Sequence, residues 1–154
     1  MLYGRENHVV RAVVQRVSEG SVTVDGVVVA ACGAGVVVLV GVANGDDADA
    51  AVRLAGKVAR LRIFENAEGR FDRSLVDVRG QVLVVSQFTL IANTRKGNRP
   101  SFTDAASPGL AEPVVEAFAA ALEAEGLHVG RGAFGARMQV SLVNDGPVTI
   151  VLES

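Results

Sequence analysis

The sequence predicts a single-domain α/β fold, and three observations lead to that prediction. The chain has 154 residues, a length that suits one domain with a core of its own. Hydrophobic residues make up 49% of it, which is too many for a disordered segment. Short valine-rich runs alternate with two stretches of helical periodicity, so strands and helices are both expected. No internal repeat or linker divides the chain.

Charge and composition narrow the classes of partner. The formal net charge of −2 argues against bulk electrostatic capture of nucleic acid, although a local basic patch can still bind it. Aromatic residues are only 5%, which disfavours a base-stacking single-strand binder. Cys32 is the only cysteine, which fits a reducing compartment. Residues 1–8 resemble no signal peptide, and the apolar run 35–43 is too short to cross a membrane. We expect a cytoplasmic protein with no DNA or membrane partner.

The first third of the chain predicts a group of strands. Residues 12–17, 21–24 and 27–30 are rich in β-branched residues, and Asp25-Gly26 predicts a tight hairpin between the last two. Residues 36–42 are apolar without alternation, as in a strand that is covered on both faces.

A helix is expected after this group of strands. Asp46, Asp47 and Asp49 suit its N-terminus, where carboxylates accept hydrogen bonds from free N–H groups. One face of the helix is apolar and the other is basic. The apolar stripe consists of Ala51, Leu54, Ala55, Val58 and Leu61, and the basic side of Arg53, Lys57 and Arg60. A solvated face explains these cations better than phosphate binding does.

The second half predicts a short strand from Ile63, a central strand over 81–88 and an irregular segment over 91–107, which is long enough to suggest function. A second helix lies between Ser107 and Glu125, and a start at Glu112-Pro113 keeps proline out of its interior. Two strands, 138–143 and 148–152, close the chain around Asn144-Asp145-Gly146-Pro147. This tetrapeptide has the composition of a hairpin loop, but a proline suits such a loop poorly.

Three potential sites have simpler explanations. Residues 130–135 match G-x-G-x-x-G, but a strand rather than a helix is expected after them, so they predict no dinucleotide site. Cys32 lies in a valine-rich strand, which indicates a core position. His8 and His128 are too few for a metal site, and His128 is expected at the surface.

The end of the central strand is more informative. If the strand runs to Phe88, alternation places Ser86 and Phe88 on one side and Gln87 and Thr89 on the other, as the floor of a polar pocket. No neighbouring base is present to activate either hydroxyl group. Backbone N–H groups at the strand end then offer an oxyanion hole.

These segments together resemble one family. Residues 86–90, 94–102 and 144–149 are similar to the signature motifs of the D-aminoacyl-tRNA deacylases, also called D-tyrosyl-tRNA deacylases, and Gln15-Arg16-Val17 and Met138-Gln139-Val140 match in order and spacing. The resemblance runs from Arg11 to the C-terminus, so residues 1–10 are expected to be a dispensable extension of a domain over 11–154. Asn93 stands where many members carry an acid.

The resemblance implies a homodimer whose subunits have a barrel-like, mixed but largely antiparallel sheet and two main helices. It implies hydrolysis of the ester bond of D-aminoacyl-tRNA, and of mischarged glycyl-tRNA, without a metal or organic cofactor. The site would lie at the dimer interface, where a cis Gly146-Pro147 dipeptide of one subunit enters the pocket of the other. Such a rigid main-chain wall would reject L-amino acids by steric conflict.

The resemblance also assigns residues. Main-chain atoms around Ser86, Gln87, Phe88 and Thr89 would form the catalytic centre, with the 2′-hydroxyl of the tRNA assisting the chemistry. The substrate pocket would be completed by Gly146, Pro147, Arg16, Met138 and Asn144. The basic cluster of Arg95, Lys96 and Arg99 is expected to contact tRNA phosphates.

Two other functions remain open on the residues alone. The chain could be a general esterase or peptidase with Ser86 or Thr89 as nucleophile, or a non-catalytic dimer that binds RNA or a small metabolite. Discrimination between D- and L-aminoacyl esters separates the first from a deacylase, and turnover separates the second.

Overall fold

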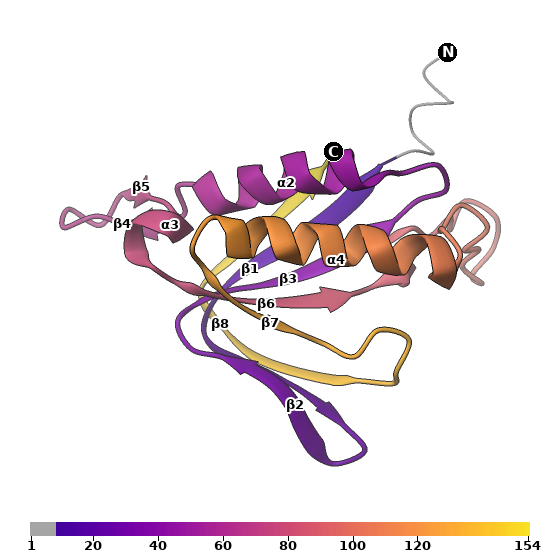
Figure 1. Cartoon of the computed structure of the whole chain (residues 1–154), viewed down its shortest axis with the longest axis horizontal. Coiled ribbons are helices and arrows are strands. Elements are labelled where there is room, and N and C mark those ends of the chain that lie inside the picture. Colours follow the sequence, from indigo (N-terminus) through magenta and orange to yellow (C-terminus); the bar gives the residue numbers. More distant parts are fainter. Residues whose placement is uncertain (1–8) are drawn as a thin grey trace.

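The long strand β1 (Val10–Val24) organises the sheet in the computed structural model, which describes residues 9–154 (Figure 1). One edge of β1 pairs first with β3 (Gly35–Val42) and then with β2 (Val27–Cys32), both antiparallel. Its other edge pairs with β8 (Gln139–Glu153), also antiparallel. Because one bent strand carries three partners, the sheet curls into a nearly closed barrel. The predicted strands 12–17 and 21–24 are thus parts of a single strand.

The other half of the sheet is parallel. β6 (Gln81–Ser86) pairs with β3, and β7 (His128–Arg131) pairs with β6. The expectation of a largely antiparallel sheet is therefore wrong, and the six-stranded sheet is mixed. The reason lies in the connections, because both parallel pairs are joined by long crossovers that contain helices.

Two helices cover one face of this sheet. α2 (Ala48–Arg60) and α4 (Pro108–Ala124) lie side by side across it in Figure 1. Asp47 is the N-cap of α2 and accepts a hydrogen bond from the Ala50 N–H at 2.9 Å, which confirms the predicted acidic start. Phe118 of α4 is fully buried in the core between helices and sheet. Truncation of such a phenylalanine to alanine typically costs about 3–5 kcal/mol of stability.

The start of α4 differs from the prediction. The helix begins at Pro108 rather than at Glu112-Pro113, so Pro113 lies inside it. Pro113 lacks the N–H that would bond the carbonyl of Gly109, four residues earlier. Only one helical hydrogen bond is lost so near the N-terminus, whereas Ala111 and Val114 of the first turns become buried against the sheet. Burial of these side chains explains why the helix begins at Pro108 despite the lost hydrogen bond.

A short segment between α2 and β6 was not fully predicted. It contains a small hairpin of β4 (Phe64–Glu65) and β5 (Phe71–Arg73), followed by the four-residue helix α3 (Leu75–Val78). The Ser74 hydroxyl and the Asp77 carboxylate cap α3 reciprocally. An element of four residues is too short to show a helical period, so the sequence offered no signal except this cap.

The inner face of the curled sheet carries a second, smaller core. Val17, Val22, Val37, Leu83 and Val85 form it together with Cys32. Cys32 is therefore a core residue, as predicted, and burial raises the pKa of its thiol, which makes it a poor nucleophile. β3 is buried along nearly its whole length because cores lie on both of its faces, which confirms that prediction too.

The two predicted C-terminal strands are one element. Residues 139–143 and 148–152 do not form a hairpin but belong to β8, which begins one residue after the predicted start at Met138 and follows β1 along almost its whole length. β1 begins at Val10, one residue before the expected domain start at Arg11. The Val10 side chain is fully buried. The expectations for residues 1–8 lie outside the described residues. No helix within residues 9–154 is long and apolar enough to span a membrane.

Candidate active site

The strand β6 ends at Ser86, two residues earlier than predicted, and the chain then turns. Phe88–Leu90 form a short 3-10 helix, η1, instead of continuing the strand. The Gln87 N–H still donates to the Val40 carbonyl at 2.8 Å, whereas the Ile91 N–H donates to the Phe88 carbonyl at 2.9 Å. The predicted alternation of Ser86 and Phe88 against Gln87 and Thr89 is therefore wrong. The Gln87 side-chain amide instead donates to the Thr89 hydroxyl within the turn.

A cavity of about 540 Å³ opens beside this turn. Ser86, Gln87 and Phe88 line one side of it, and Met138 lines another, so the fold brings together four of the predicted site residues. Helix α4 contributes Pro108, Ala111 and Val115. The loop before α4 contributes Phe102, and the segment between β7 and β8 contributes Phe134 and Ala136. Phe88 and Phe102 meet edge to face, with ring centroids 5.2 Å apart. An apolar cavity with a few polar groups at one end is typical of a site for a small ligand.

Within residues 9–154, no ionisable side chain lines this cavity. Neither the Ser86 hydroxyl nor the Thr89 hydroxyl forms a hydrogen bond to a His, Asp, Glu or Lys side chain of these residues, although Glu112 and Ser86 line the same adjoining cavity. An activated side-chain nucleophile is therefore not formed in this arrangement. The first N–H groups of a helical turn have no partner within the turn. Those of Phe88 and Thr89 are therefore the candidates to stabilise negative charge on a reacting carbonyl oxygen.

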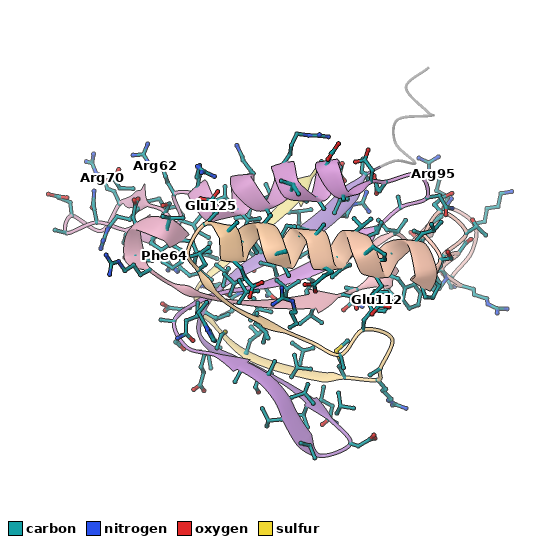
Figure 2. All side chains as sticks on the ribbon, in the orientation of Figure 1. Arg62, Phe64, Arg70, Arg95, Glu112 and Glu125 are labelled. Carbon is teal, nitrogen blue, oxygen red and sulfur yellow. The ribbon has the colours of Figure 1, made fainter. Side chains whose placement is uncertain are left out.

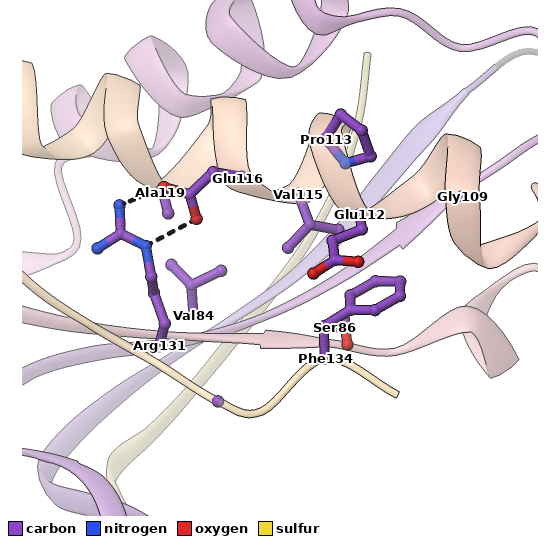
Figure 3. Close-up of a pocket in the computed structure, with 11 residues that line it drawn as sticks. Val84, Ser86, Gly109, Glu112, Pro113, Val115, Glu116, Ala119, Arg131 and Phe134 are labelled. Atoms are coloured by element: carbon purple, nitrogen blue, oxygen red, sulfur yellow. Dashed lines mark hydrogen bonds and ion pairs between the residues drawn. The ribbon is translucent and has the colours of Figure 1, made fainter. Parts of the chain in front are cut away.

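A second cavity of about 440 Å³ adjoins the first, since Ser86, Val115 and Phe134 line both (Figure 3). Its far end holds Arg131, which donates to both carboxylate oxygens of Glu116 at 2.9 Å and to Glu123 at 2.6 Å. The hydrogen bonds to Glu123 and Glu116 raise the pKa of Arg131, which stays charged. This network closes the end of the second cavity and links α4 to β7.

The Gly146-Pro147 segment forms a bulge in β8. Gln15 pairs with Thr149 and Val17 pairs with Asn144, so residues 145–148 lie opposite Arg16 alone. The Gly146–Pro147 peptide bond is cis, as predicted, and both residues are exposed. The bulge is held at its base by the Asn144 side-chain carbonyl, which accepts from the Val148 N–H at 2.9 Å.

Arg16 is the second support of the bulge. Its side chain is buried, with 7% of the residue exposed, and its Nε donates to the Asp145 carbonyl at 2.9 Å. The same guanidinium donates to the Ile63 carbonyl at 2.8 Å and lies 5.6 Å from the centre of the Phe71 ring. Arg16 and Asn144, predicted as pocket residues, therefore hold the bulge instead of lining the cavity of their own chain.

The bulge and the cavity lie far apart within the chain. Arg16 pairs with Val36 at the start of β3, whereas Ser86 pairs with Val40. Four residues of strand separate the two positions by roughly 13 Å. None of Arg16, Asn144, Gly146 or Pro147 lines the cavity, and Thr89 lies in the turn without lining it.

The basic loop lies at the cavity end of the molecule. Arg95, Lys96 and Arg99 are all exposed, and none forms an ion pair with another residue of the described chain. Figure 2 places Arg95 at the opposite end from Arg62 and Arg70. A bridge between Asn93 and Ser101 closes the loop, and the Asn93 side-chain carbonyl accepts from the Arg95 N–H at 2.9 Å. An acid at that position would accept the same bond, so the amide preserves the loop.

Sequence reasoning missed part of the cavity wall. Phe134 and Gly135 belong to the G-x-G-x-x-G match, and the strand β8 rather than a helix follows them, which confirms the strand that was predicted after this motif. The same residues nevertheless line the cavity. His128 is exposed, as predicted. No sequence pattern links Phe134 to residues 86–88, because the contact depends on the parallel pairing of β6 with β7.

An apolar pocket beside a turn with unpaired main-chain N–H groups is typical of a protein that binds a small ligand. Residues 13–153 match the model of the D-Tyr-tRNA(Tyr) deacylase family, and the chain belongs to this family. It is 62% identical to a D-aminoacyl-tRNA deacylase of Roseiflexus castenholzii over 94% of this chain and 92% of that protein. A Thermus aquaticus protein of the same name is 56% identical over 94% of this chain and 95% of its own length.

Solved structures agree on the fold. A structure described as c-Myc DNA Unwinding Element Binding Protein superposes with a TM-score of 0.87 and 41% identity, over 94% of this chain and 98% of that one. A probable eukaryotic D-amino acid tRNA deacylase superposes with a TM-score of 0.81 at 19% identity, over 95% and 100% of the two chains, which shows the fold alone.

Proposed function

We propose that this chain hydrolyses the ester bond of D-aminoacyl-tRNA and releases the free D-amino acid and tRNA. The family and the similar deacylases support the reaction. The observation that carries it to this chain is the cavity at the end of β6. It lies beside a turn whose first N–H groups have no partner within the turn, and no ionisable side chain of residues 9–154 lines it. Such a site suits a substrate ester that carries its own assisting group, such as a neighbouring hydroxyl.

The catalytic step follows from that lining. The N–H groups of Phe88 and Thr89 stabilise the oxyanion that forms when water attacks the ester carbonyl. Because the cavity supplies no side-chain base, the vicinal 2′-hydroxyl of the terminal ribose assists the attack on the substrate side. Ser86, Gln87 and Met138 then position the aminoacyl group and are not consumed in the reaction.

The complete site is proposed to form between two copies of the chain. β8 joins both halves of the site, since Val140 lies at its cavity end, Met138 directly precedes the strand, and Gly146-Pro147 form its bulge. Two such strands related by a two-fold axis between these halves bring each bulge to the partner's cavity. Val143 lies between the halves and is 49% exposed, so it offers apolar surface for this contact.

Chiral selection follows from the same arrangement. A main-chain wall formed by the bulge rejects the side chain of an L-amino acid by steric conflict and leaves room for that of the D-isomer. Glycine has no side chain to reject, so mischarged glycyl-tRNA is expected to be a substrate as well. Arg95, Lys96 and Arg99 are proposed to contact tRNA phosphates in the cytoplasm, where tRNA is charged.

The test is a comparison of D-Tyr-tRNA and L-Tyr-tRNA as substrates of the purified chain. We expect release of D-tyrosine with multiple turnovers and negligible release of L-tyrosine. Equal hydrolysis of both would favour a general esterase, and binding without turnover would favour the non-catalytic alternative. Size-exclusion chromatography with light scattering tests the dimer separately, and a monomeric active enzyme would contradict the shared site.

A further inference from the structure

Arg11, near the start of β1, contacts the turn that forms the candidate catalytic centre. Its Nη1 donates to the carbonyl of Leu90, the last residue of η1, at 2.7 Å. Its Nε and Nη2 lie 2.9 Å and 2.8 Å from the Glu153 carboxylate of β8, the strand neighbour of Arg11. One planar guanidinium therefore connects the C-terminal strand to the turn.

The same turn is packed against β3 at the other neighbour of Arg11. Gly41 pairs with Arg11, and a Cβ at Gly41 would lie 2.9 Å from the Gln87 carbonyl oxygen and 2.9 Å from the Leu90 Cβ. The turn is thus seated directly on the backbone of β3. Val40 holds the Gln87 N–H at its start, and Arg11 holds the Leu90 carbonyl at its end.

The last carbonyl groups of a helical turn lack partners within the turn, so a bond from outside fixes their direction. η1 has only three residues, and its end is hydrogen-bonded to its start. The Ile91 N–H donates to the Phe88 carbonyl at 2.9 Å, and the Leu90 N–H donates to the Gln87 carbonyl at 3.1 Å. These two carbonyl groups share peptide units with the N–H groups of Thr89 and Phe88, so a shift at the end of the turn is passed to both N–H groups. Arg11 and Glu153 are 32% and 49% exposed at their side chains, and ion pairs this exposed contribute little to folding stability. Their principal effect is on the orientation of the turn.

We propose that Arg11, oriented by Glu153, is a positioning residue for the deacylase reaction: it aligns the main chain of residues 87–89 through the Leu90 carbonyl. This inference rests on the proposed function. Misplacement of a reacting group by about 1 Å can cost a factor of about a hundred in rate. Loss of the Arg11 bond therefore lowers kcat without removing any group that touches the substrate.

Arg60 provides a matched control. It is also an arginine that binds one backbone carbonyl, Gly56 at 3.1 Å, and one glutamate, Glu125 at 3.0 Å, but it lies on the outer side of α2. The experiment compares Arg11→Met, Arg11→Lys and Arg60→Met for kcat and KM on D-Tyr-tRNA. In parallel, amide hydrogen exchange is measured at Leu90 and Ile91, whose N–H groups close η1.

We expect Arg11→Met to lower kcat by about tenfold to a hundredfold with KM nearly unchanged, and to speed exchange at Leu90 and Ile91. Arg11→Lys should recover part of kcat, because an ammonium can still donate to the Leu90 carbonyl. Arg60→Met should change neither readout. Unchanged kcat in Arg11→Met, or an equal loss in Arg60→Met, would overturn the inference while the proposed function stands. A wild-type chain without deacylase activity would overturn the proposed function, and the inference with it.

Discussion

The turn after β6 and the bulge in β8 differ in shape, but both are held by an arginine of β1. At the end of β6 the chain leaves the strand as a turn and lines a cavity, whereas at the middle of β8 it leaves the strand as an exposed bulge. An arginine of β1 binds a backbone carbonyl at each place: Arg11 binds Leu90, and Arg16 binds Asp145.

Both the turn and the bulge expose the backbone of the chain. Both segments have main-chain groups that the sheet does not pair, and such groups recognise a ligand without depending on the identity of its side chain. Arg16 is buried, whereas Arg11 is partly exposed, so the bulge is held more rigidly than the turn. We infer that the bulge serves as a fixed wall and the turn as the reacting centre, where small changes in orientation alter the rate.

The largest effect is expected from a side chain added to the bulge. A Cβ at Gly146 would lie 2.9 Å from the Val148 Cγ2 and 3.0 Å from the Arg16 Nη2, at a φ of +134°. Gly146→Ala should therefore lower kcat/KM for D-Tyr-tRNA by about a hundredfold or more, because it displaces the wall. Gly26→Ala is the control, since Gly26 also has a positive φ, +78°, but open space around it.

Mixed dimers sharpen this prediction. Ala136→Phe fills the cavity and leaves the bulge intact, whereas Gly146→Ala spoils the bulge and leaves the cavity intact. Co-refolding of the two inactive variants should restore about a quarter of the wild-type sites, because half of the dimers are mixed and each holds one good site. No recovery in proven mixed dimers would mean that the bulge acts within its own chain.

A smaller effect is expected at the basic loop. Replacement of Arg95, Lys96 and Arg99 by glutamine should raise KM for tRNA about tenfold or more, and should reduce the slope of log KM against log salt by about two units. The triple variant Arg53→Gln/Lys57→Gln/Arg60→Gln on the exposed face of α2 removes the same number of charges and controls for net charge. An unchanged slope would assign the loop cations to local structure.

A still smaller effect is expected when the hydroxyl group of Ser86 or Thr89 is removed, and its size tests whether either group is a nucleophile. Ser86→Ala and Thr89→Ala each remove at most one or two hydrogen bonds, so each should lower kcat by about two- to tenfold. Removal of a hydrolase nucleophile costs on the order of a million-fold. A loss of that size, or an acyl-enzyme trapped on either hydroxyl and seen by mass spectrometry, would restore the esterase interpretation.

The smallest effect is expected at the N-terminus. Removal of residues 1–8 should leave kcat/KM and the unfolding temperature unchanged. Removal of residues 1–10 also deletes Val10, which is fully buried and whose N–H donates to the Ser154 hydroxyl at 2.9 Å. That longer truncation should cost about 2 kcal/mol of stability, measurable by urea unfolding. Loss of activity in the shorter truncation would contradict the extension hypothesis.

Features that depend on neighbouring residues in the chain are predictable from the residue types alone. Helix α2 was predictable because its capping carboxylate and its apolar stripe are local signals, and the strands β3 and β6 because their residues are β-branched and continuous. The Gly146-Pro147 dipeptide was identifiable because its residue types are unusual between two strand-forming runs. The motifs also identified Ser86, Gln87, Phe88 and Met138, which meet at one cavity.

Other features depend on contacts between segments that are far apart in the chain, and these contacts exist only in the folded protein. β8 is one strand rather than a hairpin because it pairs with β1, more than a hundred residues away, and no local signal reports that partner. α4 begins at Pro108 because burial of its first turns outweighs a single lost hydrogen bond. Arg11 and Arg16 acquire their roles in the same way: each binds a carbonyl that only folding brings within reach, and a sequence pattern records residue types but not such distances.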